Sequence, residues 1–575
     1  MLDTVIRGGT ILDGSGGPAF TGDVGILAGR VAEVGRIAGR GAREIDAAGL
    51  LVAPGWVDVH THYDGQVTWD PQLTPSCWHG VTTVVMGNCG VGFAPAEAAR
   101  HDWLISLMEG VEDIPGTALA EGIRWEWEGF PEYLDAIERR PHALDVAAQV
   151  PHGALRAYVM GERGADHTEK PTPGEIAEMA RQVREALEAG ALGFTTSRTR
   201  NHRTRDGAFT PSLTAPDEEL LGIAAALGEA GCGVFEIVSD FAKGGDELVL
   251  LRRMIEVSGR PMSISVAQHD MAPDGWRGML GAIAAANAEG LPMRAQVPPR
   301  AIGLLLGLQA TVNPFSGHPS FREVAGLPLA EQVARLGGPT LRRRILSEEG
   351  QGGLASLIGR FERMFLLGDP PDYEPAADRS VAAEAGRRGV PAAELAYDLL
   401  LEDEGRTLLY YPLFNYSGFN LDVSREMLLD PNTVPGLGDA GAHCGMICDG
   451  SFPTFLLSHW GKDRKRGEKL PVEWLVKRQT ADTADLVGLG DRGRIAPGMR
   501  ADLNLIDWDA LRLRPPEMVF DLPAGGKRLV QRVEGYHATL VAGEVTFQGG
   551  EATGALPGRL VRGAQPAPAG AGGAA

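Results

Sequence analysis

The sequence predicts an α/β protein: a (β/α)8 barrel that carries a small β-sandwich domain built from both chain ends. Eight β-branched segments alternate with helix-like stretches between residues 56 and 439, and this alternation is typical of a parallel sheet. Short strand-like segments bounded by glycine turns fill residues 1–50 and recur at 500–550. A closed barrel is the first expectation, and an open doubly wound sheet is the alternative.

The barrel strands are expected where apolar runs are bounded by turn residues. Helical spacing of apolar residues is clearest at 173–189 and 217–230, and both of these segments have acidic starts. The eight predicted strands span residues 56–62, 82–89, 145–152, 193–197, 233–238, 262–266, 293–297 and 434–439.

These strands set the expected domain boundaries. The sandwich takes residues 1–54 and 491–555, and the barrel takes residues 55–490. The distance between the seventh and eighth strands is too long for one strand–helix unit, so an insertion, mostly helical, is expected at about 298–433. Residues 556–575 are rich in glycine, alanine and proline and are expected to form a disordered tail.

Composition excludes several classes of protein. The chain has 575 residues, of which 44% are hydrophobic and 22% charged, as in ordinary globular proteins. Its 54 basic against 75 acidic residues give a net charge of −21, which disfavours a nucleic-acid partner. No apolar run reaches the ~18–20 residues that span a bilayer, and no secretory signal pattern opens the chain. Five cysteines suit a reducing cytoplasm. The expected partner is a small molecule, with a homo-oligomer left open.

The strongest chemical signal is the pair His60 and His62 at the end of the first predicted strand. Residues two apart in a strand point to the same face, so both imidazoles converge. At the carboxyl end of a barrel strand they face the mouth where active sites form. Neutral imidazole nitrogens suit zinc, so the pair is consistent with a metal site, and two polar residues that merely end a strand are the equal alternative.

Longer motifs resemble a known family. The composite β-domain, the segment Pro-Gly-Trp-Val-Asp-Val-His-Thr-His at 54–62 and the late segment at 492–503 resemble the amidohydrolase superfamily. The segment at 80–95, with Gly-Asn-Cys-Gly, resembles its N-acyl-D-amino-acid deacylase (D-aminoacylase) branch, and 438–441 fits this branch too. The resemblance covers about residues 1–550. It implies a hydrolase of non-peptide carbon–nitrogen amide bonds, with an N-acyl (D-)amino acid or a related small amide as substrate.

The resemblance also assigns site residues. Cys89 matches the family's metal-binding cysteine, and a thiolate is a strong ligand for a soft metal ion. Asp439 matches the catalytic aspartate, which takes a proton from water and gives it to the leaving nitrogen. With His60 and His62 these residues form the expected metal site, which is predicted to hold one zinc per chain.

Two positions depart from the family pattern. Val238 and Val266 stand where the family places histidines at the ends of the fifth and sixth strands, and valine binds no metal. Glu236 and His269 are the nearest candidate replacements. The departures favour one bound metal over two. They also leave open the alternative that this protein is a catalytically silent family member that binds a ligand without hydrolysing it.

Substrate recognition departs as well. Arg300 is the obvious carboxylate-binding residue in the stretches that correspond to the family's recognition residues. Arg198 begins a basic run after the fourth strand, and His152 ends the third strand. These three residues are the predicted substrate-binding set. The alternative for the Arg198 run is a solvated loop with salt bridges to the acidic surface, and the alternative for His152 is a packed or hydrogen-bonded strand end. A cyclic amide is therefore the alternative substrate.

Overall fold

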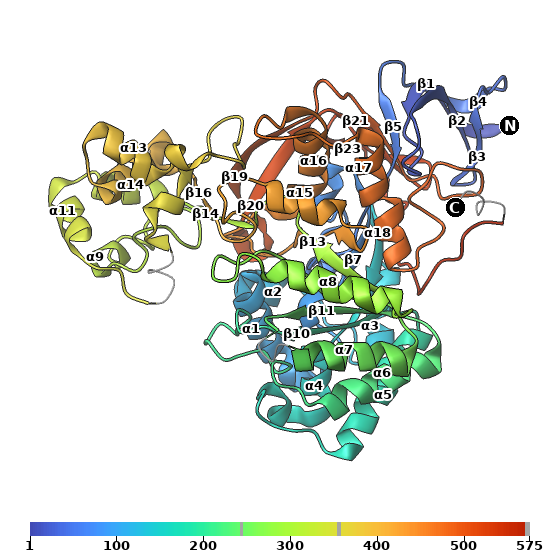
Figure 1. Cartoon of the computed structure of the whole chain (residues 1–575), viewed down its shortest axis with the longest axis horizontal. Coiled ribbons are helices and arrows are strands. Elements are labelled where there is room, and N and C mark those ends of the chain that lie inside the picture. The colour runs from blue at the N-terminus through green and yellow to red at the C-terminus, as the bar shows by residue number, and fades with distance from the viewer. Residues whose placement is uncertain (242–244, 353–357, 570–575) are drawn as a thin grey trace.

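The computed structural model describes residues 1–241, 245–352 and 358–569 (Figure 1). Its centre is a set of parallel strands in two sheets. The first sheet joins β6 (Trp56–Asp58), β7 (Val81–Met86) and β8 (Asp145–Ala148). The second sheet joins β9 (Val150–Pro151), β10 (Gly193–Arg198), β11 (Val234–Ser239), β12 (Met262–Ser265), β13 (Met293–Val297) and β17 (Thr433–Pro435), in that order.

The two sheets meet at both ends of this series. Only Gln149 separates β8 from β9, so the chain runs directly from one sheet into the other. At the opposite end, a parallel bridge joins Thr61 to Ala440, and the His62 N–H donates to the Ala440 carbonyl at 2.8 Å. The segments that follow the first and last parallel strands therefore lie side by side.

The central strands form because they are apolar on both faces. All six residues of β7 are buried, as in parallel sheets covered by helices. Helices α5 (Pro173–Glu188), α6 (Asp217–Ala230), α7 (Gly245–Ser258) and α8 (Gly275–Ala288) lie between these strands in the chain. Thr172 begins α5 by accepting a hydrogen bond from the Glu175 N–H at 3.2 Å, which is a capping box. The two helices predicted from apolar spacing, α5 and α6, are confirmed.

Two strands end earlier than predicted, so that Cys89 and Asp439 lie beyond them. The strand predicted at 82–89 ends at Met86, because Gly87 and Cys89 have positive φ angles of 86° and 55°. The strand predicted at 434–439 ends at Pro435, and Asp439 has a φ of 45°. Both functional side chains therefore leave from turns that follow strands, and sequence periodicity does not describe such turns.

Both chain ends contribute to one nine-stranded sheet. It joins β1 (Leu2–Ile11), β2 (Phe20–Leu27), β3 (Arg30–Gly35), β4 (Gly41–Asp46), β5 (Leu51–Pro54), β18 (Leu503–Ile506), β21 (Tyr536–Val541), β22 (Glu544–Gln548) and β23 (Glu551–Ala552). Strands β5 and β18 pair antiparallel and so link the two ends of the chain. A separate hairpin joins β19 (Arg512–Leu522) and β20 (Gly526–Glu534). Strand pairing thus places both ends in one layer, and the second layer of a sandwich stays a prediction.

A buried ion cluster ties this composite sheet to the central strands. Asp145 at the start of β8 accepts from Arg492 Nη1 and from Arg500 Nη2, each at 2.8 Å. The side chain of Asp145 is 0% exposed, and that of Arg492 is 1% exposed. Removing one member of such a cluster leaves buried charges without a partner.

Substitution of Asp145 by alanine is therefore expected to lower the free energy of unfolding by about 3–5 kcal/mol, as for other broken buried ion pairs. Chemical denaturation followed by circular dichroism measures this loss. Asp485→Ala is the control, because Asp485 pairs with Arg494 at the surface and such pairs contribute about 0–1 kcal/mol. Equal losses in the two variants would contradict the prediction.

The long insertion forms a lobe of its own at one side of the molecule (Figure 1). Its core is a separate cluster of apolar side chains that includes Leu306, Phe315 and Leu409. Its described residues form helices and a three-stranded antiparallel sheet. Its described helices and strands are β14 (Gly303–Leu306), α9 (Pro319–Arg322), α10 (Leu329–Leu336), α11 (Pro339–Ser347), β15 (Phe365–Leu366), α13 (Val381–Arg388), α14 (Ala392–Leu401) and β16 (Leu409–Pro412). Helix α15 (Asp422–Leu429) follows in the main body (Figure 1), where Met427 and Leu428 join the main core.

The prediction of a disordered tail is wrong for residues 556–569. Leu560 and Val561 are 4% and 1% exposed, and the Val561 N–H donates to the Val146 carbonyl at 2.7 Å. The composition signal failed because two apolar residues suffice to seat the segment beside β8. Residues 570–575 lie outside the described part of the chain.

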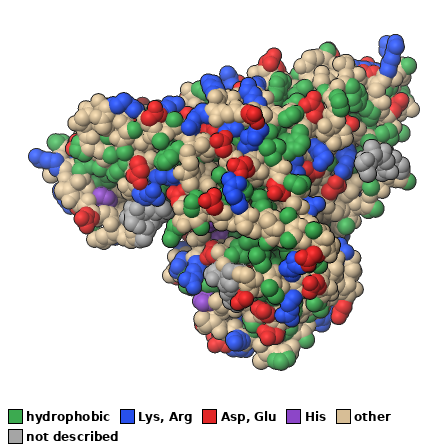
Figure 2. Space-filling view, in the orientation of Figure 1, with side chains coloured by type: hydrophobic (Ala, Val, Ile, Leu, Met, Phe, Trp, Pro, Cys, Tyr) green, Lys and Arg blue, Asp and Glu red, His purple; other side chains and the backbone are tan. Residues whose placement is uncertain are grey.

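The visible surface mixes acidic and basic side chains (Figure 2), in keeping with exposed pairs such as Arg344 with Glu323. Over the described ranges, every helix is too short or too polar to cross a bilayer.

Candidate metal centre

His60 and His62 lie just beyond β6, where the chain stays extended and fully buried. Each residue is 1% exposed, and the ring centroids are 5.6 Å apart. The His60 N–H donates to Asp58 Oδ1 at 3.1 Å, which fixes the start of this stretch. Ligand atoms of His60, His62 and Cys89 all lie within 4.8 Å of one another. The structure thus brings together the three residues in one potential metal site.

Cys89 reaches this point from the turn after β7. Its Sγ lies 3.4 Å from His60 Nε2, and its backbone N–H donates to Glu236 Oε2 at 3.0 Å. Burial, with the nearby Glu236 carboxyl, raises the pKa of the Cys89 thiol well above its ordinary value. A bound metal ion reverses this preference, because coordination deprotonates a thiol outright.

Asp439 completes the group from the turn after β17. Its Oδ1 lies 3.2 Å from His60 Nε2 and 3.6 Å from His62 Nε2. Burial alone would raise the pKa of Asp439, but the neighbouring His443 and His62 rings hold it well below its usual value. The carboxylate is therefore ionised, and one of its oxygens faces both imidazoles.

These side chains fit a divalent metal of the zinc type. Two imidazoles, a thiol and a carboxylate are the donors that zinc takes in proteins. Both ring nitrogens of His62 and Asp439 Oδ1 are buried without a hydrogen-bond partner in the described structure. Such unsatisfied groups are costly, and coordination to a metal would satisfy one ring nitrogen of His62 and Asp439 Oδ1. His60 Nδ1 already pairs with Gln296 Oε1 at 2.8 Å, which leaves its Nε2 free for a metal.

Charge supports the same interpretation. Burial lowers the pKa of His62, but the Glu112 and Asp439 carboxylates outweigh it and raise the pKa to about 9. Without a metal, a proton therefore occupies His62 at neutral pH. Metal binding would displace this proton, as is usual for histidine ligands.

The strand-five and strand-six ends supply no histidine. Val238 is half-buried in β11 and Val266 is 4% exposed just after β12. Glu236 points toward the Cys89 turn: its Oε2 accepts from the Cys89 N–H and its Oε1 from Ser265 Oγ at 3.3 Å. His269 packs its ring against Phe414, with centroids 4.7 Å apart. Glu236 thus supports Cys89, and His269 is not part of the cluster.

The assignment of Arg300 to substrate binding is corrected. Its guanidinium is 1% exposed, pairs with Asp449 Oδ1 at 2.9 Å and stacks 3.5 Å over the Tyr373 ring. It also donates to the Cys448 carbonyl and Ser451 Oγ, each at 3.1 Å. These polar partners all lie at Nη2, and the guanidinium is buried among internal groups.

The assignments of Arg198 and His152 are corrected for the same reason. Arg198 Nε donates to Glu247 Oε1 at 2.7 Å, and both side chains are 3% exposed. His152 Nε2 pairs with Glu219 Oε1 at 2.7 Å, and its Nδ1 pairs with Thr196 Oγ1 at 2.8 Å. His152 is thus the hydrogen-bonded strand end of the alternative interpretation, whereas Arg198 forms a buried ion pair and not a solvated one.

Sequence reasoning missed Glu112 and His443. Glu112 ends helix α1 (His101–Glu112), is 1% exposed, and places Oε1 3.5 Å from His62 Nδ1. His443 Nε2 lies 3.6 Å from Glu112 Oε2 and 3.6 Å from Asp439 Oδ2. One available signal was the pair Glu112–Asp113, because acidic residues at the carboxyl end of a helix oppose its dipole.

His202 is a further residue near the cluster. It comes from the basic loop after β10, and its Nδ1 pairs with Ser197 Oγ at 2.9 Å. Burial lowers the pKa of His202 to about 4, although nearby Glu112 opposes the shift. The ring is therefore neutral at pH 7.

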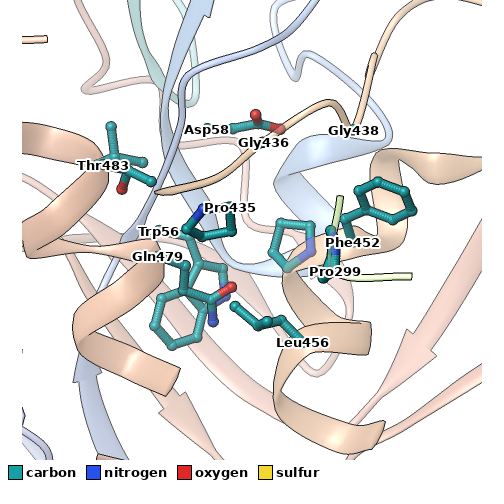
Figure 3. Close-up of a pocket in the computed structure, with 12 residues that line it drawn as sticks. Trp56, Asp58, Pro299, Pro435, Gly436, Gly438, Phe452, Leu456, Gln479 and Thr483 are labelled. Atoms are coloured by element: carbon teal, nitrogen blue, oxygen red, sulfur yellow. The ribbon is translucent and has the colours of Figure 1, made fainter. Parts of the chain in front are cut away.

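A separate cavity lies where β6 meets the 435–438 segment and helices α16 (Phe452–Leu457) and α17 (Val472–Gln479) (Figure 3). Its walls are mostly apolar, and Asp58 is the only titratable residue among those that line it. Burial raises the pKa of Asp58 to about 6, although the hydrogen bond from the His60 N–H acts to lower it. None of the four candidate ligands lines this cavity, so we do not assign substrate to it.

Parallel strands whose ends bring together two histidines, a cysteine and an aspartate form the arrangement of a metal-dependent hydrolase. The family model described as "Amidohydrolase family" matches residues 43–547, and the chain belongs to that family. It is an amidohydrolase that acts on carbon–nitrogen bonds other than peptide bonds.

Relatives match along nearly the whole chain. D-aminoacylase from Alcaligenes xylosoxydans xylosoxydans is 27% identical, with 97% of each chain covered. N-acyl-D-aspartate deacylase from the same organism is 28% identical, over 97% of this chain and 95% of its own. An uncharacterised protein of Mycobacterium tuberculosis is 29% identical, over 96% of this chain and 92% of its own. The resemblance to the D-aminoacylase branch is confirmed.

Solved structures show the same fold. A crystal structure of D-aminoacylase has a TM-score of 0.64 and 24% identity, over 98% of this chain and 100% of its own. N-acyl-D-glutamate deacylase from Bordetella bronchiseptica has a TM-score of 0.63 and 22% identity, over 98% and 99%. The α/β amidohydrolase fold is therefore confirmed.

Proposed function

We propose that this protein is a zinc-dependent deacylase that hydrolyses an N-acyl-D-amino acid or a related small amide. The observation that carries the proposal is the convergence of His60, His62, Cys89 and Asp439 at one buried point. The names of relatives support the substrate class, since two of them are a D-aminoacylase and an N-acyl-D-aspartate deacylase. Zinc is supported by the donor set and by the described zinc complex of the N-acyl-D-glutamate deacylase.

The proposal includes one catalytic zinc per chain, a cytoplasmic location and closure of the parallel strands into a (β/α)8 barrel. The bridge between Thr61 and Ala440 supports closure, because it joins the segments after the first and last strands. Closure puts the carboxyl ends of all the strands at one mouth, where barrel enzymes build their sites.

The chemistry follows from the positions of the ligands. A metal bound to these residues would polarise a carbonyl group and make a bound water more acidic. Asp439 Oδ1 faces the two imidazoles, while Oδ2 faces His443 Nε2 at 3.6 Å. As an ionised carboxylate, Asp439 takes a proton from the attacking water and later gives it to the amide nitrogen. The carbon–nitrogen bond breaks, and the products are a carboxylic acid and an amine.

The corrected roles of Arg300 and Arg198 favour a second candidate, hydrolysis of a cyclic or otherwise neutral amide. Both guanidiniums are held by internal carboxylates. Neither is therefore free to hold the carboxylate of an N-acyl amino acid. The substrate panel must include amides without a carboxylate.

The test is hydrolysis by the purified wild-type protein of N-acyl-D-amino acids, N-acyl-L-amino acids, neutral N-acyl amines and cyclic amides. We expect turnover of the N-acyl-D series, loss of that turnover after removal of the metal with a chelator, and recovery with added zinc. Turnover of cyclic amides alone would favour the second candidate. Chelation without effect on turnover, or no turnover with zinc supplied, would overturn the proposal.

A further inference from the structure

The end of helix α1 holds the loop that follows β17. The Glu112 carbonyl accepts from the His443 N–H, and Asp113 Oδ2 accepts from the Gly445 N–H at 2.9 Å. Thr311 of the insertion lobe also donates to Asp113, at 3.1 Å. The loop that begins with Asp439 is thus attached to a helix that precedes it by more than 300 residues in the chain.

The Glu112 side chain lies between two imidazole rings. Oε1 is 3.5 Å from His62 Nδ1, and Oε2 is 3.6 Å from His443 Nε2. Glu112 Oε1 and His62 Nδ1 are both buried, and neither has a hydrogen-bond partner among the described residues. They face each other, and a small approach would convert this contact into a hydrogen bond.

Burial and helix position both disfavour a carboxylate here. The side chain is 2% exposed, and a buried carboxylate loses its hydration. Its position in the last helical turn also opposes the helix dipole. Two unfavourable features at a residue that faces a candidate metal ligand point to a role in the centre.

We propose that Glu112 is the positioning residue of the metal centre. It accepts the Nδ1–H of His62 and thereby presents Nε2 of the same ring toward Asp439 Oδ1 and the metal. His60 has a similar arrangement, in which Gln296 Oε1 takes Nδ1 at 2.8 Å and Nε2 faces Cys89 and Asp439. A carboxylate partner also makes the ligating nitrogen more basic, so Glu112 strengthens the bond at His62.

The inference rests on the proposed function only in requiring a metal at His62, and zinc affinity tests it. Zinc dissociation constants are measured by chelator competition for wild type, Glu112→Gln and Glu112→Asp. We expect Glu112→Gln to bind zinc about 10–100-fold more weakly, as for other outer partners of ligating histidines. Glu112→Asp keeps the charge and is expected to recover part of the loss. The visible spectrum of the cobalt-substituted protein should change in Glu112→Gln, because the His62 ring is released.

Glu109→Gln is the matched control, since Glu109 lies on the same helix and pairs with the exposed Arg205. Thermal unfolding of the metal-free proteins separates positioning from folding. Wild-type zinc affinity and cobalt spectrum in Glu112→Gln would overturn the inference, even if the metal-free variant melts earlier. Failure of the wild type itself to bind zinc would instead overturn the proposed function.

Discussion

Replacement of His60 and His62 together by alanine is expected to remove the bound metal and to abolish hydrolysis. The two rings are half of the four candidate ligands, and the remaining Cys89 and Asp439 do not complete a zinc site. A metal contributes several kcal/mol of transition-state charge stabilisation, so kcat/KM should fall by at least about 10³-fold. Elemental analysis of the purified variant and the hydrolysis assay measure the two effects.

His537→Ala is the control for this experiment, because His537 is an exposed histidine of β21. It should keep wild-type metal content and activity. A double variant that loses the metal but still hydrolyses the substrate would show that the cluster is not the catalytic site. Retention of the metal would show that other residues hold it.

Asp439→Asn is expected to lower kcat by about 10²–10⁴-fold at saturating zinc, the usual contribution of a general acid–base group. Asparagine keeps the shape of the side chain but takes no proton from water. It also removes the negative charge that raises the pKa of His62, so that pKa should fall in the metal-free variant. Steady-state kinetics and NMR titration of the His62 ring provide the measurements.

Asp509→Asn is the matched control at an exposed site and should leave kcat unchanged. The kinetic result is informative only if Asp439→Asn is assayed with zinc in excess, since Asp439 is also a candidate ligand. A variant with wild-type kcat under these conditions would exclude Asp439 as the proton carrier.

The metal cluster was predictable because its signals are local. His60 and His62 are two residues apart on an extended stretch, and their spacing alone determines that the rings share a face. Cys89 and Asp439 were found by resemblance, although their strands end earlier than predicted, at Met86 and Pro435. Positive φ angles at Gly87 and Leu437, just past these strands, accompany the early ends.

The substrate-binding residues were not predictable in this way. Arg300, Arg198 and His152 are polar residues after strands, which is also where substrate contacts occur. Their actual partners are Asp449, Glu247 and Glu219, which come from other segments of the chain. Glu112 illustrates the converse, because only the packing of α1 against the last loop brings it to His62. Pairings between distant segments decide these roles, and a single sequence does not show them.

The composite sheet has a consequence for biosynthesis. Strand β5, made within the first tenth of the chain, pairs with β18, which is made only after residue 502. While the central strands are being synthesised, the β5 edge lacks this neighbour, and a bare edge is a site for pairing with other chains. The edge of β5 is therefore covered only when β18 has been synthesised and pairs with it.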